Sequence, residues 1–153
     1  MCTGGPYEFE QDLKEVNLHM QIADLLGVKY LSPVALPSDD RLWPVQGVLF
    51  GLAKRPLVSL PTQLRSGMPC VNVFFLVDTT APISKISPSA FNALGSDAAL
   101  PNATHGIVNG VHCHQQICTN DIPVLGADYF TRIGGVIAIN YNQDTISVDR
   151  ACT

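Results

Sequence analysis

Residues 73–81 read VFFLVDTTA and lie in the middle of a chain of 153 residues. The first five are apolar without a break, which is typical of a β-strand covered on both faces. We expect this strand to begin at Val71 and to end at Val77. Asp78, Thr79 and Thr80 follow at once, so the strand delivers a carboxylate and two hydroxyls into a turn. An Asp-Thr pair after a strand can also simply cap that turn.

A second segment, residues 122–130, reads IPVLGADYF. Two aliphatic residues, Val124 and Leu125, precede Gly126 and an apolar stretch that ends at Phe130.

The rest of the chain after Pro56 predicts short strands with tight turns. Strand-like runs cover residues 47–53 and 56–60, and a short helical turn is expected at residues 88–95. The sequence Asn109-Gly110 between apolar residues is the strongest short hairpin signal. A closing hairpin is expected over residues 136–148. The fold class is therefore mainly β, as a small barrel or sandwich.

The first 55 residues have a different character. Apolar residues recur at spacings of four and three, which predicts an amphipathic helix that ends near Gly27. These residues are Phe9, Leu13, Val16, Met20, Ala23 and Leu26. The helix is expected to bury this face on its own domain, with docking on a partner as the alternative. Residues 32–44 contain Pro33, Pro37 and the only tryptophan, Trp43, and predict an irregular, extended connection.

Composition limits the possible partners. Apolar residues make up 46% of the chain and charged residues only 14%, a low share that hints at surface buried against another protein. The net charge is −4 and the basic residues are scattered, so binding to nucleic acid is not expected. No stretch of about 18 apolar residues occurs, so no membrane span is expected.

The cysteines indicate the compartment. They form an odd, widely spaced set without a C-x-x-C pair, at Cys2, Cys70, Cys113, Cys118 and Cys152. The N-terminus lacks the basic and apolar regions of a secretory signal. We therefore expect free, mostly buried thiols in an intracellular, reducing compartment, either the cytoplasm or an organelle matrix.

His112-Cys113-His114, with His105 and Cys118 nearby, contains the imidazole and thiolate groups that bind zinc. In a strand, the two histidines face one side and the cysteine faces the other, so the three cannot converge. Ordinary strand alternation is therefore the expectation, with no metal and no cofactor.

The segments around Asp78 and Gly126 resemble the two halves of a retropepsin-like aspartic peptidase. The resemblance runs over residues 56–148 and implies a small closed β barrel. It divides the chain into an N-terminal extension, residues 1–55, and a retropepsin-like domain, residues 56–153. Val124, Leu125 and Gly126 match the hydrophobic-hydrophobic-glycine motif that packs behind the catalytic loop.

The resemblance implies catalytic roles for Asp78, Thr79 and Thr80, with structural support from Ala81, Val124, Leu125 and Gly126. The family's chemistry uses two facing aspartates that share one proton. This chain supplies one, so activity requires a homodimer that joins two copies of Asp78. Thr79 is then expected to hydrogen-bond across the dimer below the dyad, and Gly126 to allow packing too close for a side chain.

Two features depart from the family pattern. Its usual Asp-Thr/Ser-Gly reads Asp78-Thr79-Thr80 here, which adds a β-branched side chain beside the carboxylate. Residues 95–106, where the substrate-covering flap is expected, are short and lack paired glycines. The two resulting hypotheses are a dimeric aspartic endopeptidase, and an inactive relative that joins other protein subunits through the N-terminal extension.

Overall fold

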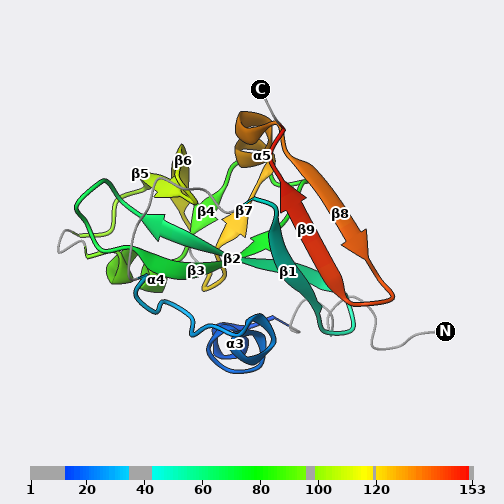
Figure 1. Ribbon diagram of the computed structural model, residues 1–153. Coiled ribbons are helices and arrows are strands. Elements are labelled where there is room, and N and C mark those ends of the chain that lie inside the picture. The colour runs from blue at the N-terminus through cyan, green and yellow to red at the C-terminus, as the bar shows by residue number, and fades with distance from the viewer. Residues whose placement is uncertain (1–12, 35–42, 96–98, 119, 152–153) are drawn as a thin grey trace.

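The computed structural model describes residues 13–34, 43–95, 99–118 and 120–151, and in them the strands form one nine-stranded sheet (Figure 1). The strands are β1 Val45–Phe50, β2 Arg55–Gln63, β3 Val71–Val77, β4 Lys85–Ile86, β5 Ala103–Val108, β6 Val111–Ile117, β7 Val124–Leu125, β8 Val136–Asn140 and β9 Thr145–Asp149. The helices are α2 Glu15–His19, α3 Gln21–Leu26, α4 Pro88–Ala93 and α5 Ala127–Ile133. The protein is therefore mainly β, as the sequence predicts.

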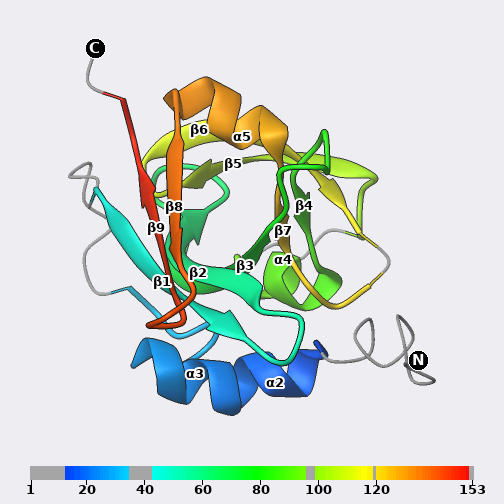
Figure 2. The same ribbon diagram turned by 90° about the vertical axis from the view of Figure 1, so that its right-hand side faces the viewer.

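Six strands are linked into a ring, because the order β3-β7-β4-β6-β5-β2 is completed by a pairing of β3 with β2. In Figure 2 these strands surround the interior, with α5 above them and α2 and α3 below. The links are unequal. β2 and β3 share a long antiparallel ladder, from Leu57 opposite Leu76 to Thr62 opposite Val71. β4 and β7 meet at one pair, Lys85 opposite Val124. The sheet is thus a partial ring, and the closed barrel stays a prediction.

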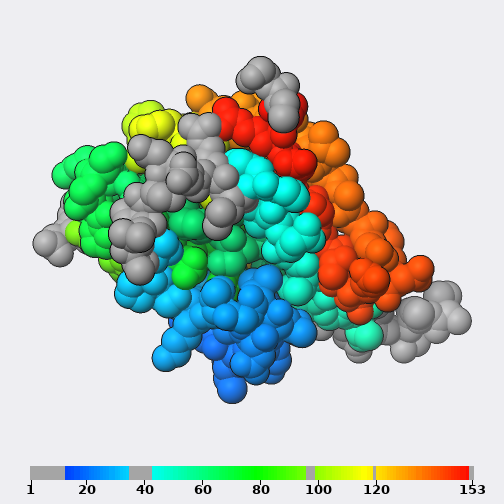
Figure 3. Space-filling view, in the orientation of Figure 1, coloured from blue at the N-terminus to red at the C-terminus, as the bar shows by residue number. Residues whose placement is uncertain are grey.

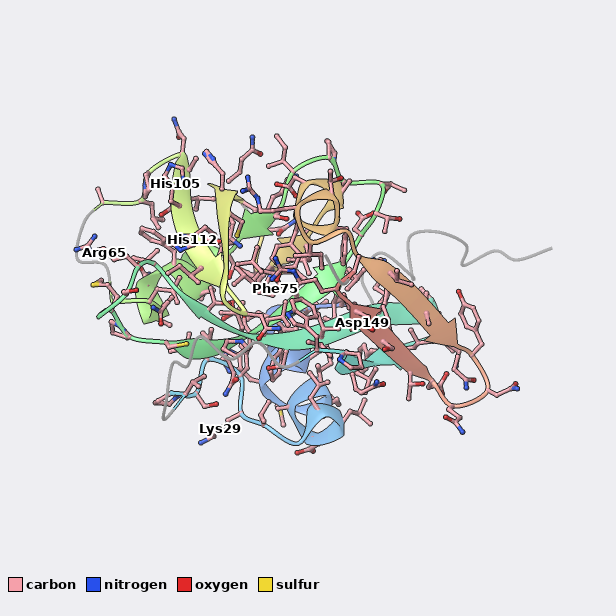
Figure 4. The ribbon with its side chains drawn as sticks, turned by 45° about the horizontal axis from the view of Figure 1, so that its top comes forward. Lys29, Arg65, Phe75, His105, His112 and Asp149 are labelled. Carbon is pink, nitrogen blue, oxygen red and sulfur yellow. The ribbon has the colours of Figure 1, made fainter. Side chains whose placement is uncertain are left out.

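β3 forms the centre of the core and has the bounds that its sequence predicts. It lies between β2 and β7. Phe74 and Phe75 are adjacent and therefore point to opposite faces, yet both are fully buried, and Figure 4 shows Phe75 in the interior. The strand is covered on both faces, as its unbroken apolar run indicates.

Both predicted hairpins form. β5 and β6 are joined by Asn109 and Gly110, whose φ angles of 48° and 79° are the positive values that a type I′ turn requires. β8 and β9 form the closing hairpin, and β9 also pairs with β1. β8 lies at the edge of the sheet.

The predicted N-terminal helix is only partly correct. The described part is two short helices, α2 and α3, that are separated at Met20. The predicted face is wrong at Val16 and Met20, which are 53% and 57% exposed, whereas Leu18 and Ile22 are fully buried. Leu13 and Ala23 of the predicted face are buried, so the prediction fails at two positions and not along the whole face. Phe9 lies outside the described residues.

The helices and β1 pack against the rest of the molecule. Figure 3 shows α2 and α3, in blue, beside β1, in cyan. β1 pairs with β2 and β9, so residues 45–50 of the predicted extension belong to the same sheet as the rest of the fold. The strand predicted at residues 47–53 ends at Phe50, because residues 51–54 form a turn with positive φ at Gly51 and Lys54. The division between residues 55 and 56 stays a prediction.

Within the described parts of the chain, no helix has the length and apolar character needed to cross a membrane.

Candidate active site

Asp78 lies where two parallel strands end together. β3 and β7 pair in parallel, with Leu76 opposite Val124 and Val77 opposite Leu125. The backbone N–H of Asp78 then donates to the carbonyl oxygen of Leu125 at 3.0 Å. The segments that contain Asp78 and Gly126 are therefore joined directly by backbone hydrogen bonds.

The carboxylate of Asp78 holds the turn that follows it. Its Oδ1 atom accepts hydrogen bonds from the Thr80 backbone N–H at 3.0 Å and from the Thr80 hydroxyl at 2.5 Å. The carbonyl of Asp78 accepts from the N–H of Ala81 at 3.1 Å. The turn-capping role that sequence left open is thus present, and Thr80 takes part in it. The side chain of Thr79 is exposed.

Gly126 lies against the same turn. A Cβ atom at this position would be 2.6 Å from the carbonyl oxygen of Ala81 and 3.0 Å from the backbone carbon of Ile83. The next residue, Ala127, donates its N–H to that Ala81 oxygen at 2.7 Å. Only glycine fits at position 126 without moving the backbone of the Asp78 turn.

Ser84 and Asp128 connect the two loops through side chains, and the sequence analysis did not identify either one. The buried Ser84 hydroxyl accepts from the N–H of Gly126 at 2.9 Å and donates to Asp128 Oδ1 at 2.7 Å. The same oxygen accepts from the backbone N–H groups of Ser84 and Tyr129, at 2.9 and 2.8 Å. An acidic residue in the first turn of α5 was the available signal for Asp128, whereas Ser84 gave none.

Asp78 lines a hollow of about 340 Å³. Asp78 supplies the carboxylate among its described lining residues, and the others are Ala53, Arg55, Pro56, Leu76 and Val77. A neighbouring hollow of about 430 Å³ also includes Arg55 and Leu76 and carries both charge signs, from Lys14, Glu15 and Asp121. The sequence gave no reason to assign Arg55 to this site, because only the packing of distant segments places it in the same hollow as Asp78.

The histidine and cysteine positions follow strand alternation, as predicted. His112 and His114 are exposed on β6, and Cys113 between them is buried. In the part of the chain described here, no three His, Cys, Asp or Glu residues are grouped to hold a metal ion. Cys70, Cys113 and Cys118 are free and buried. Burial, more than any neighbouring charge, raises the pKa of the Cys113 thiol to about 12.

A known crystal structure has a fold similar to that of this chain. A crystal structure of a retropepsin-like aspartic protease from Rickettsia conorii superposes with a TM-score of 0.50 and 16% sequence identity. The match covers 72% of this chain and 96% of that chain. The fold is retropepsin-like. No family model matches the sequence, and no curated protein matches it. At this identity, the retropepsin likeness concerns the arrangement of the backbone and not the chemistry of its residues.

Proposed function

We propose that this chain is a retropepsin-like aspartic endopeptidase domain that hydrolyses peptide bonds as a homodimer, with Asp78 contributed by each copy. The observation that supports it best is the parallel β3–β7 pairing, which holds Asp78 beside Leu125 and Gly126, where Asp78 lines a hollow. The retropepsin-like backbone adds to this support.

The chemistry requires two carboxylates in contact. Two like charges about 3 Å apart cannot both ionise, so the pair shares one proton. One carboxylate then acts as the base for a water molecule while the protonated one donates to the substrate carbonyl. In this proposal Thr79 hydrogen-bonds across the dimer below the two aspartates. Ala81, Val124, Leu125 and Gly126 hold each loop in place.

A dimer also accounts for exposed apolar surface at the edge of the sheet. Val136 of β8 is 62% exposed, Ile139 is 40% exposed, and Tyr141 just beyond the strand is 64% exposed. Val136 and Ile139 face opposite sides of β8, and an edge strand with exposed apolar residues on both faces suits contact with another chain.

The test is cleavage of a diverse peptide mixture between pH 4 and pH 7, read by mass spectrometry. Wild type is compared with Asp78→Asn, and Asp24→Asn is the matched control because Asp24 is exposed on α3. We expect cuts that disappear in Asp78→Asn and persist in Asp24→Asn. Sedimentation at the same concentration gives the oligomeric state. A protein that stays monomeric, or cuts that survive Asp78→Asn, would exclude the proposal.

An inactive interaction subunit is the second candidate. Thr80 favours it, because its hydroxyl and N–H both occupy one oxygen of the carboxylate that catalysis needs. The N-terminal helices also expose Val16, Met20 and Leu25, the last at 57%, which would suit contact with another subunit. A dimer without Asp78-dependent cuts would support this candidate over the first.

A further inference from the structure

We propose that His105 and His114 form a two-histidine binding site for a divalent transition-metal ion on the solvent face of the β5–β6 hairpin. The two histidines are nine positions apart in the sequence, on either side of the predicted Asn109-Gly110 turn. In the structure they are directly opposite each other, and their ring centroids are 5.0 Å apart. Figure 4 shows the two strands side by side, with His105 on β5 and His112 on β6.

The hairpin register explains why the two side chains meet. Val108 and Val111 flank the two-residue turn and form a hydrogen-bonded pair of the antiparallel ladder. Pairs alternate in character along such a ladder, so His105 and His114, three steps away, form a non-hydrogen-bonded pair. Side chains approach each other most closely at pairs of this kind.

The ring separation suits one shared ion. With a metal–nitrogen distance of about 2.0–2.1 Å and tetrahedral angles, two imidazoles on the same ion have ring centroids roughly 5 Å apart. Imidazole nitrogen is a preferred ligand of Zn²⁺, Ni²⁺ and Cu²⁺. Both histidines are exposed, so solvent can complete the coordination without any further protein ligand.

The neighbouring pairs on the same face of the hairpin carry no carboxylate and no lysine or arginine, with Ala103 opposite Gln116 on one side and Ile107 opposite His112 on the other. The nearest lysine along the sheet is Lys85 of β4, which is opposite Gln116 and so one pair away from the two histidines. Cys113 faces the interior, so its thiol does not contribute to this site. Such an ion would join β5 to β6 and stabilise the hairpin that forms one third of the ring.

His112 provides a matched control. It lies on the same strand and the same face as His114 and is also exposed, but it is opposite Ile107 instead of a histidine. The experiment is calorimetric titration of Ni²⁺ into the untagged full chain, because Ni²⁺ favours imidazole whereas thiolates favour softer ions. We expect one saturable site in wild type. His105→Ala and His114→Ala should each weaken binding roughly tenfold or more, because a two-ligand chelate becomes a single ligand. His112→Ala should bind as wild type does.

A second measurement on the wild-type protein does not depend on how the variants fold. Paramagnetic Ni²⁺ broadens the proton NMR signals of the rings that bind it. The signals of His105 and His114 should disappear at lower Ni²⁺ than those of His112 and His19. The proposal fails if all four histidines broaden together, if His112→Ala weakens binding as much as His114→Ala, or if no saturable site is found.

Discussion

Thr80 donates both its backbone N–H and its hydroxyl to the same oxygen of Asp78, at 3.0 and 2.5 Å. This oxygen belongs to the carboxylate that the proposed reaction needs. Thr80 stands where the retropepsin pattern has glycine. It therefore binds the Asp78 carboxylate directly and also adds bulk beside it.

Replacement of Thr80 should separate these two effects. Thr80→Gly removes the hydroxyl and the β-branched bulk, so we expect kcat/KM for peptide cleavage to rise roughly tenfold, equivalent to about 1.4 kcal/mol. Thr80→Ser keeps the hydroxyl and removes the methyl group. A rise in Thr80→Gly alone would assign the effect to the hydroxyl-bearing carbon that serine keeps, whereas a rise in both would assign it to the methyl group. Equal or lower activity in Thr80→Gly would contradict the expectation.

Gly126→Ala should destabilise the fold. The added Cβ would meet the Ala81 carbonyl oxygen at 2.6 Å, so the backbone of the Asp78 turn must move. We expect a loss of about 2–4 kcal/mol in the free energy of unfolding, measured in urea. Gly106→Ala is the control, because its Cβ would come no closer than 3.3 Å to the side-chain end of Gln115 and 3.5 Å to backbone. A loss in Gly126→Ala no larger than in the control would show that the turn adapts.

Ser84→Ala should loosen the connection between the two loops. Without the hydroxyl, the buried N–H of Gly126 and one lone pair of Asp128 lose their partner. An unsatisfied buried polar group costs about 1–3 kcal/mol of stability. Asp128→Ala removes the accepting oxygen and breaks the same connection, so the double variant should lose less than the sum of the two single losses. Strict additivity in urea unfolding would show that the two residues act independently.

The Cys113 thiol should make the protein less stable at high pH. Its pKa is raised by burial to about 12 in the folded protein, from its usual value of 9.0. The folded state therefore favours the neutral thiol. Its contribution to the free energy of unfolding is fully present below pH 9. It is lost as the pH rises toward 12, by about 1.4 kcal/mol per pH unit. Urea unfolding from pH 8 to pH 11 should show a shallower decline in Cys113→Ala than in wild type. Identical slopes would contradict the assignment.

Local signals made much of the fold predictable. The unbroken apolar run identified β3 with its bounds, and Asn109-Gly110 identified the β5–β6 turn. Both features depend on residues close in sequence. The N-terminal helix shows the limit, because apolar residues on two faces allowed two choices and packing selected Leu18 and Ile22.

For the candidate site, the sequence allowed individual residues to be named but not the contacts between distant segments. Asp78 and Gly126 could be named because their segments resemble the two halves of a retropepsin-like peptidase. Their contacts depend on pairs far apart in sequence, such as Ser84 with Asp128 and Asp78 with Leu125. The same is true of Arg55, which reaches the hollow beside Asp78 through packing alone.

The ring has a consequence for how the protein takes shape during synthesis. Its strand β3 is complete at Val77, yet its parallel neighbour β7 begins only at Val124. In a chain made from the N-terminus, β2 and β3 are complete dozens of residues before β7 becomes available. Pairings between distant segments also form slowly once both are present. Asp78 therefore leaves the ribosome early but acquires its surroundings late, when Leu125 and Gly126 arrive.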